Sequence, residues 1–270
     1  MKAIDSTWTP ALLLALGMAL AGPACGSDDD GGGSPDAAAG EPDAAASAAD
    51  AAVRATPAPF DPSTPYQPDV DPADLSADIT NPLFPAPVGA TWSYSAETPD
   101  GLETTEISVE PATVDVNGVA ARELRDTVFL DGEIIEDTRD WFAQDGAGNV
   151  WYLGEDTAEY EGGVIVSTEG SWQWGVDDAL PGVNMLGDPQ IGDLYRQEYL
   201  AGEAEDYGEV VSLDEAVTVP AGSFTGCTVT RDRSAIEPAA DELKYYCAGV
   251  GTVLTEEGDV RDELIDYAVP

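Results

Sequence analysis

Apolar and polar residues alternate along most of the chain after residue 90, and this period of two is typical of β-strands with one buried face. Turn residues separate the alternating stretches at short intervals. The pattern predicts strands at residues 91–95, 104–109, 113–116, 119–130, 133–144, 149–160, 164–174, 192–199, 209–219, 223–231, 242–248, 251–256 and 262–267. Residues 178–186 contain Pro181, which interrupts any helix, and we interpret them as part of a loop.

Glycine-containing dipeptides mark the chain reversals. Asn117-Gly118 is a strong signal for a two-residue hairpin turn, and Asp131-Gly132 and Gly162-Gly163 reverse the chain in the same way. A sheet of roughly ten or more strands rarely stays flat. We therefore predict an all-β fold with one domain, an antiparallel meander curled into an open or closed barrel.

The composition changes ahead of this domain. Residues 27–55 are mostly Ala, Asp, Gly and Pro, and the motif Pro-Asp-Ala-Ala-Ala occurs at 35–39 and again at 42–46. Such a segment cannot bury enough apolar surface to fold, so we expect a disordered tether. The predicted organisation is a signal peptide at 1–24, a disordered tether at 25–77 and a β domain at 78–270.

An apolar run at residues 11–25 ends in small residues and Cys25. It is too short to cross a membrane as a helix, which takes roughly 20 residues. The run resembles a bacterial lipoprotein signal, in which the cysteine thiol receives a diacylglycerol and becomes the mature N-terminus. This resemblance implies a lipid-anchored protein of the cell envelope, and Gly26 and Ser27 favour the outer membrane. The alternative is ordinary signal-peptide cleavage near Ala24, which gives a secreted protein with a free thiol.

The chain is strongly acidic, with 53 Asp and Glu against 10 Lys and Arg, and it contains no histidine. A net charge of −43 repels nucleic acid and anionic lipid headgroups, so neither is expected as a partner. A hydrated surface suited to a salty medium is the simpler explanation, and binding of cations or of a basic partner is the other. Without histidine, Ser-His-Asp and Cys-His catalytic groups and His-ligated metal sites are excluded.

Two cysteines remain once Cys25 is assigned to the lipid. Cys227 and Cys247 each lie in a β-like stretch, and export places them in an oxidising compartment. We predict one disulfide between neighbouring strands, closing a loop of about 20 residues.

A polar site follows from the register of the Asp131-Gly132 hairpin. If Leu130 opposes Glu133, then Asp126 lies opposite Asp137, with Arg139 on the same face. Directly opposed like charges destabilise a strand pair, so this pair needs a neutralising group. An Arg–carboxylate cluster on a wet face is one interpretation, and a Ca²⁺ site at a barrel mouth is the other. No other cofactor is expected.

Glycoside hydrolysis by two carboxylates is the one common catalytic mechanism that the composition leaves open. Glu155 and Asp156 follow Trp151, and Trp172 lies downstream, which is compatible with a sugar-stacking cleft. Aromatic residues in strands are more often core or cross-strand pairs, so we favour a non-catalytic protein.

Several longer motifs resemble those of exported bacterial proteins of unknown function. They are NPLFP (81–85), RDT (125–127), DWFAQD (140–145), GNVWYLGEDT (148–157), STEGSW (167–172), VTVPAGSF (217–224) and YYCAGVG (245–251). The last two are also distantly similar to half-barrel envelope proteins of the lipoprotein-carrier (LolA/LolB) kind, which hold acyl chains in an apolar concavity. The resemblance implies a binding or structural module with a small apolar ligand or a protein partner. A secreted carboxylate-based hydrolase is the alternative function.

Overall fold

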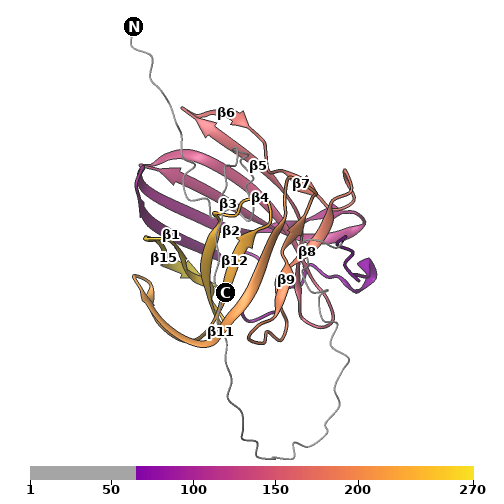
Figure 1. Ribbon diagram of the computed structural model, residues 1–270. Helices are drawn as coiled ribbons and strands as arrows, with labels where there is room; N and C mark the ends of the chain where they lie inside the picture. The colour runs from indigo at the N-terminus through magenta and orange to yellow at the C-terminus, as the bar shows by residue number, and fades with distance from the viewer. Residues whose placement is uncertain (1–64) are drawn as a thin grey trace, which may run out of the picture.

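The computed structural model describes residues 65–270, and these form one antiparallel sheet of 15 strands (Figure 1). The only helical element in this part of the chain is a single 3-10 turn, η1, at Pro72–Asp74. No helix within residues 65–270 is long and apolar enough to span a bilayer. The predicted all-β fold class is confirmed.

Most of the strands follow one another as hairpins. Their bounds are β1 (Thr91–Thr98), β2 (Gly101–Val116), β3 (Val119–Leu130), β4 (Glu133–Gln144), β5 (Val150–Glu161), β6 (Val164–Ser167), β7 (Trp172–Gln173), β8 (Leu180–Met185), β9 (Leu194–Arg196), β10 (Glu198–Tyr199), β11 (Asp206–Val219), β12 (Gly222–Ser234), β13 (Asp241–Cys247), β14 (Gly251–Glu257) and β15 (Val260–Ala268).

The sheet curls until its two edges nearly meet. Its strand order is β10-β8-β5-β4-β3-β2-β1-β15-β14-β13-β12-β11-β9, with β6 and β7 added to β5. The two outermost strands, β9 and β10, are consecutive in the chain: Arg196 pairs with Tyr207 of β11, and Glu198 pairs with Pro181 of β8. One stretch of chain therefore bridges the two edges, and the sheet forms a nearly closed barrel.

The predicted turn dipeptides occupy the turns. Asn117 and Gly118 have φ angles of 52° and 84°, and Asp131 and Gly132 have 50° and 84°. Positive φ at both positions matches the right-handed twist of the flanking strands, which is why Asn-Gly and Asp-Gly favour two-residue hairpins.

The prediction of a loop around Pro181 is wrong. Residues 180–185 form β8, which pairs with β5 and β10. Five of its six residues are buried, so the strand shows no alternation of apolar and polar positions. A strand that is covered on both faces loses the signal that identifies a half-exposed strand.

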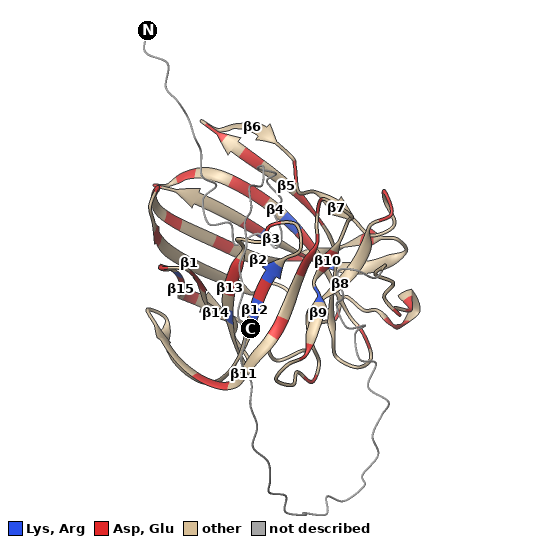
Figure 2. Ribbon diagram, viewed as in Figure 1, with Lys and Arg blue, Asp and Glu red and all other residues tan. Residues whose placement is uncertain are grey.

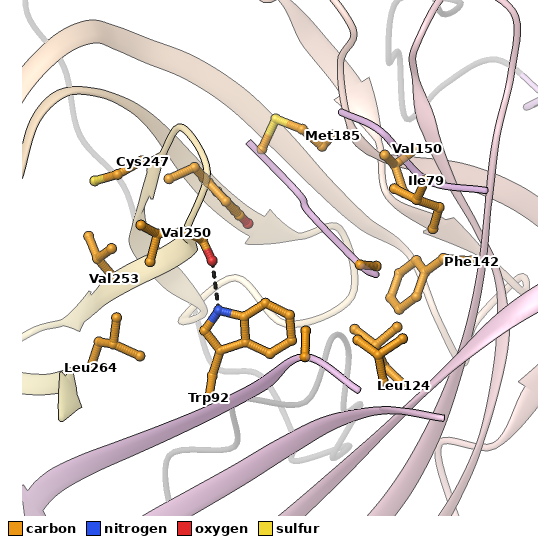
Figure 3. Close-up of a cluster of buried hydrophobic side chains, with 14 of the residues drawn as sticks. Ile79, Trp92, Leu124, Phe142, Val150, Met185, Cys247, Val250, Val253 and Leu264 are labelled. Atoms are coloured by element: carbon orange, nitrogen blue, oxygen red, sulfur yellow. Dashed lines mark hydrogen bonds between the residues drawn. The ribbon is translucent and has the colours of Figure 1, made fainter. Parts of the chain in front are cut away.

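A large apolar cluster fills part of the barrel interior (Figure 3). It joins Trp92 and Phe142 from one half of the sheet to Val253 and Leu264 from the other half, which identifies the inner face. The indole Nε1 of Trp92 donates a hydrogen bond of 2.6 Å to the carbonyl oxygen of Val250. This contact ties β1 to the turn between β13 and β14.

A second apolar cluster lies on the opposite face of β3, β4 and β5. Trp141, Trp151 and Leu153 belong to it, and Val70 and Leu75 pack against it. The Tyr66 hydroxyl also donates to the carbonyl oxygen of Pro181 at 2.9 Å. Part of the segment expected as tether, residues 65–77, thus contacts the barrel. Cys25 and the rest of the tether lie outside the described residues.

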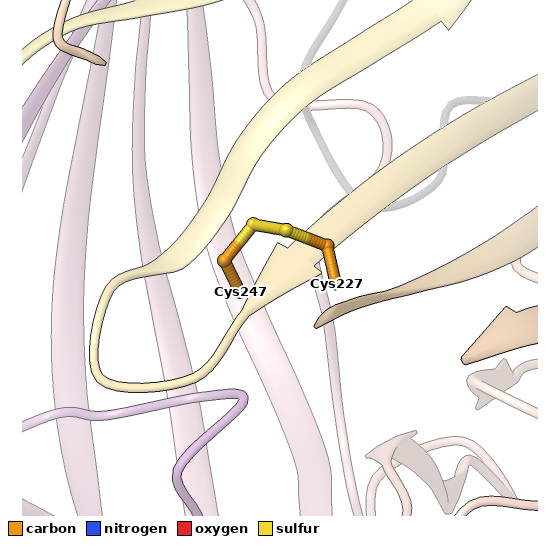
Figure 4. Close-up of a disulfide and its surroundings, with 2 residues drawn as sticks. All are labelled: Cys227 and Cys247. Carbon is orange, nitrogen blue, oxygen red and sulfur yellow. A yellow bond between two sulfur atoms is a disulfide. The ribbon is translucent and has the colours of Figure 1, made fainter. Parts of the chain in front are cut away.

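The predicted disulfide is present (Figure 4). It joins Cys227 of β12 to Cys247 of β13, with a sequence separation of 20 residues. The two strands are hydrogen-bonded neighbours, because the adjacent residues Thr228 and Tyr246 are paired.

Candidate functional site

Eight buried carboxyl side chains lie on the inner face of the barrel, next to the apolar cluster. None exposes more than 7% of its surface. These interior carboxylates are Glu103, Asp126, Glu136, Asp140, Glu155, Glu198, Asp232 and Asp262.

Strand alternation places them there. Glu103 lies on β2 in phase with Thr105 and with Val109 of the inner apolar cluster. Asp126 lies on β3 two residues from Leu124, another member of that cluster. Side chains two residues apart lie on the same face of a strand. The inward-facing positions therefore carry apolar residues near one end of each strand and acidic residues further along it.

The structure does not bring the predicted cation-site residues together. Pairing follows the expected register only at the first two positions of the hairpin, and a bulge beside Val128 then shifts it by one residue. Asp126 therefore lies opposite Thr138 and points inward. Asp137 is instead bound on the outer face by Arg125, with two contacts of 2.7 Å, and Arg139 pairs with Glu123 at 2.8 Å. The prediction of an Asp126–Asp137–Arg139 cluster is wrong, because one extra residue in β4 moves Asp137 and Arg139 to the other face.

The predicted aromatic and acidic patch is divided between the two faces. Glu155 and Trp172 are directly paired between β5 and β7, and both are buried on the inner face. Trp151 points to the opposite side, where its Nε1 donates to Asp145 Oδ2 at 2.8 Å, and Asp156 is exposed. A bulge opposite Trp141 places Trp151 on the other face from Glu155, whereas Asp156 points outward through ordinary strand alternation. Glu155 and Asp156 therefore do not face a common site.

Four interior carboxylates accept a side-chain hydrogen bond on one oxygen. The donors are Tyr152 Oη to Asp140 (2.6 Å), Thr138 Oγ1 to Glu136 (2.8 Å), Trp172 Nε1 to Glu198 (3.0 Å) and Gln197 Nε2 to Asp232 (2.9 Å). Each holds its carboxyl group in a fixed position on the wall of the barrel.

Other buried oxygens on this face have no hydrogen-bond partner. They include both oxygens of Glu103 and one each of Asp126, Glu136, Glu155, Glu198, Asp232 and Asp262, together with the hydroxyls of Thr105, Thr230 and Thr255. Buried polar atoms in folded proteins are almost always paired, so a concentration of unpaired acceptors on one face requires an explanation.

Lys244 is the basic residue that reaches this group. Its Nζ lies 3.3 Å from Asp232 Oδ2 and 3.2 Å from Glu242 Oε2. Within residues 65–270, none of the other seven interior carboxylates forms an ion pair with Lys or Arg. Acidic positions recur along the strands, whereas basic positions are few (Figure 2).

Burial raises the pKa of these carboxyl groups, and neighbouring negative charges raise it further. Burial followed by the charges of Asp262 and Glu136 raises the pKa of Glu103 to about 8. Burial raises the pKa of Asp262 to about 7. For Asp126, burial and then the charges of Asp140 and Glu136 raise the pKa well above its usual range. The charges act on one another because these carboxyl groups occupy buried positions of β2, β3, β4 and β15.

The interior carboxylates do not form a compact metal site. In residues 65–270 no three Asp, Glu or Cys side chains lie close enough to coordinate one ion. Hollows on the outer surface involve other residues, and one of about 490 Å³ is lined by Tyr207, Arg231 and Asp241. The arrangement fits several separate contacts to positive or hydrogen-bonding groups better than one coordinated ion.

Sequence reasoning missed most of this group, although a signal was present. Glu103, Asp126 and Glu136 stand at strand positions in phase with buried apolar residues, whereas solvent-facing acids occupy the alternate positions. An acid in the apolar phase of a predicted strand is the pattern that identifies such a residue.

No protein-family model matches the chain, and no curated protein matches it. Among solved structures, the chain is similar to a crystal structure described as a "putative lipoprotein" from Parabacteroides distasonis. The two chains are 14% identical with a TM-score of 0.37, and the match covers 69% of this chain and 98% of the other.

Proposed function

We propose that the protein is a non-catalytic binding module of the cell envelope that holds a ligand against the inner face of its barrel. The supporting observation is the set of unpartnered, buried carboxyl and hydroxyl oxygens on that face. Each such atom costs free energy in a barrel without ligand. A ligand that donates hydrogen bonds to these atoms removes that cost.

The ligand is polar or charged where it meets this wall. The sequence favoured a small apolar ligand, but an apolar molecule leaves both oxygens of Glu103 and one oxygen each of Asp126 and Asp262 unpartnered. The neighbouring aromatic side chains Tyr152 and Trp172 supply an apolar contact for the rest of the molecule. A hydrolase is less well supported, because Glu155 and Asp156 lie on opposite faces, whereas hydrolysis needs two carboxylates that flank one bond.

The anchor is the second part of the proposal. Cys25 follows an apolar run of signal-peptide length, and the residues after it have the composition of a tether. Diacylglycerol brings two acyl chains, and stable membrane attachment requires about two such signals. The barrel then lies at the envelope, with Gly26 and Ser27 favouring the outer membrane, and it is secreted if Cys25 stays unmodified.

Native mass spectrometry of the full chain, purified gently from its own host, tests both parts. We expect a mature N-terminus at Cys25 that carries a diacylglyceryl mass, and a small molecule bound at one copy per chain. Glu155→Gln should lose the bound molecule, and Asp156→Asn, its outward-facing neighbour, should keep it. An unmodified Cys25 overturns the anchor. A chain without any bound molecule, or equal retention by the two variants, overturns the binding site.

A further inference from the structure

The barrel interior already holds one ammonium group. Lys244 extends from β13 into the barrel, where Asp232 and Glu242 bind its Nζ at 3.3 and 3.2 Å. Although burial disfavours the charged amine, the charges of Glu242 and Asp232 outweigh it and hold the pKa of Lys244 well above its usual range. Two carboxylates on this wall are therefore sufficient to stabilise a buried ammonium.

The remaining interior carboxylates have no such cation among the described residues. One set lies on β2, β3, β4 and β15 and consists of Glu103, Asp126, Glu136 and Asp262. The other lies on β4, β5 and β10 and consists of Asp140, Glu155 and Glu198. Seven acids without a base are costly to ionise at this depth, because water solvates buried carboxylates poorly and no neighbouring cation compensates their charge.

We infer that the ligand of the barrel is an organic amine with at least two ammonium groups, one bound by each of these two sets of carboxylates. This inference rests on the proposed binding function and names its ligand class. It follows from unpartnered acceptor atoms in both sets, including both oxygens of Glu103 and one oxygen each of Glu155 and Glu198.

An amine fits this wall better than a metal ion does. Calcium requires six to eight oxygens at about 2.3–2.6 Å around one point, and the acids here are not grouped in that way. An ammonium donates three hydrogen bonds, and two or three separate acceptors satisfy it. The unpartnered hydroxyls of Thr105 and Thr255 add acceptors beside Glu103 and Asp262.

The aromatic side chains of the interior suit the carbon chain of such a ligand. Tyr152 stacks on Phe142 with ring centroids 4.8 Å apart, and Trp172 meets Tyr152 edge-on at 5.2 Å. Both Tyr152 and Trp172 donate to interior carboxyl groups, so apolar ring faces lie next to these groups. Methylene groups contact such faces favourably, and a cation near them is attracted to the ring.

Calorimetry and thermal melting of the full chain in detergent, with 0.3 M NaCl to screen the acidic surface, test the inference. The probes are spermidine and putrescine, with Ca²⁺ and Mg²⁺ as competing cations and glycerol as a neutral control. We expect an amine to bind at one copy per chain and to raise the melting temperature, with no comparable effect of the metal ions or glycerol.

Matched variants locate the binding. Glu103→Gln and Glu155→Gln each remove one ionisable carboxyl group, one from each set, and should weaken amine binding at least tenfold. Glu106→Gln and Asp156→Asn remove exposed charges from the same strands and should change it less than twofold. Because Gln has the shape of Glu, circular dichroism should show folded inner variants.

The outcomes separate the two proposals. Equal losses in inner and outer variants, or binding that 0.3 M NaCl abolishes, show surface attraction only and overturn the amine assignment. Metal binding that depends on Glu103 also overturns it. If native mass spectrometry finds a bound molecule but no amine binds, the ligand class is wrong while the binding function remains. If neither is found, both proposals are wrong.

Discussion

Single hydrogen bonds fix the loops that cover the inner apolar cluster. The Trp92 indole donates to Val250 O at 2.6 Å, and the backbone N–H of Gly249 donates to Pro82 O at 2.7 Å. Both acceptors lie in segments without strand pairing of their own. The turn after Cys247 is thus held by Trp92 of β1 and by Pro82, which precedes β1 in the chain. The disulfide fixes the start of this turn at Cys247.

Trp92→Phe should therefore destabilise the fold by about 1–3 kcal/mol, because it leaves the buried Val250 carbonyl without its donor and removes part of a large ring. Chemical unfolding measures the loss. Tyr245→Phe is the control: its hydroxyl donates to Glu256 at a half-buried position where water replaces the bond, so the expected loss is under about 1 kcal/mol. Equal losses in the two variants would show that the Trp92 bond has no special role.

Closure of the barrel depends on a close approach between β8 and the chain that bridges the edges. A Cβ atom at Gly182 would lie 2.1 Å from the backbone of Gln197, which is far inside contact distance. Glycine at this position lets Gln197 approach closely while the next two residues, Glu198 and Tyr199, pair along β8.

Gly182→Ala should push the two backbones apart and destabilise the barrel by about 1–3 kcal/mol, the usual cost of overpacking. Hydrogen exchange should become faster in β8, β9 and β10, while β1–β4 stay protected. Gly162→Ala is the control, because its added methyl group meets nothing within 4 Å. Its only cost in stability comes from placing alanine in a left-handed backbone conformation. Unchanged exchange in β8 to β10 after Gly182→Ala would contradict this account of closure.

At the level of elements, the sequence was informative where one face of a strand is exposed. Alternation and the Asn117-Gly118 and Asp131-Gly132 turns located the hairpins from β2 to β4. The sequence pattern did not reveal β8, which is covered on both faces, or the bulge beside Val128. A bulge adds one residue without altering the turn, so the register near Asp131 was predicted correctly and the register at Asp126 was not.

At the scale of the whole molecule, the acidic residues fall into two populations with different energetic costs. On the outer face they are hydrated or paired, as Asp137 is with Arg125 and Glu209 is with Arg233 at 2.7 Å. On the inner face most are buried without a counter-charge. The hydrated-surface interpretation of the net charge fits the outer population, and the proposed amine binding concerns the inner one.

The interior population makes stability depend on pH in a defined direction. Folding raises the pKa of Glu103 to about 8 and those of Glu136, Asp140 and Asp262 to about 7, in each case mainly through burial. Unfolded Asp and Glu titrate near about 4. Between these values the folded state binds more protons than the unfolded state, so stability falls as pH rises from about 4 to about 8.

We therefore expect the melting temperature of the ligand-free chain to be highest near about pH 5 and to fall steadily towards about pH 8.5, even in 0.5 M NaCl, which screens repulsion between outer charges. Glu103→Gln removes one carboxyl group whose ionisation at high pH destabilises the folded state. The melting temperature of this variant should match that of the unmodified chain at low pH and exceed it at high pH. Glu106→Gln, on the exposed face of β2, should leave the slope unchanged. A melting temperature that rises with pH, or a slope that Glu103→Gln does not reduce, would show that the interior acids ionise freely in the folded barrel.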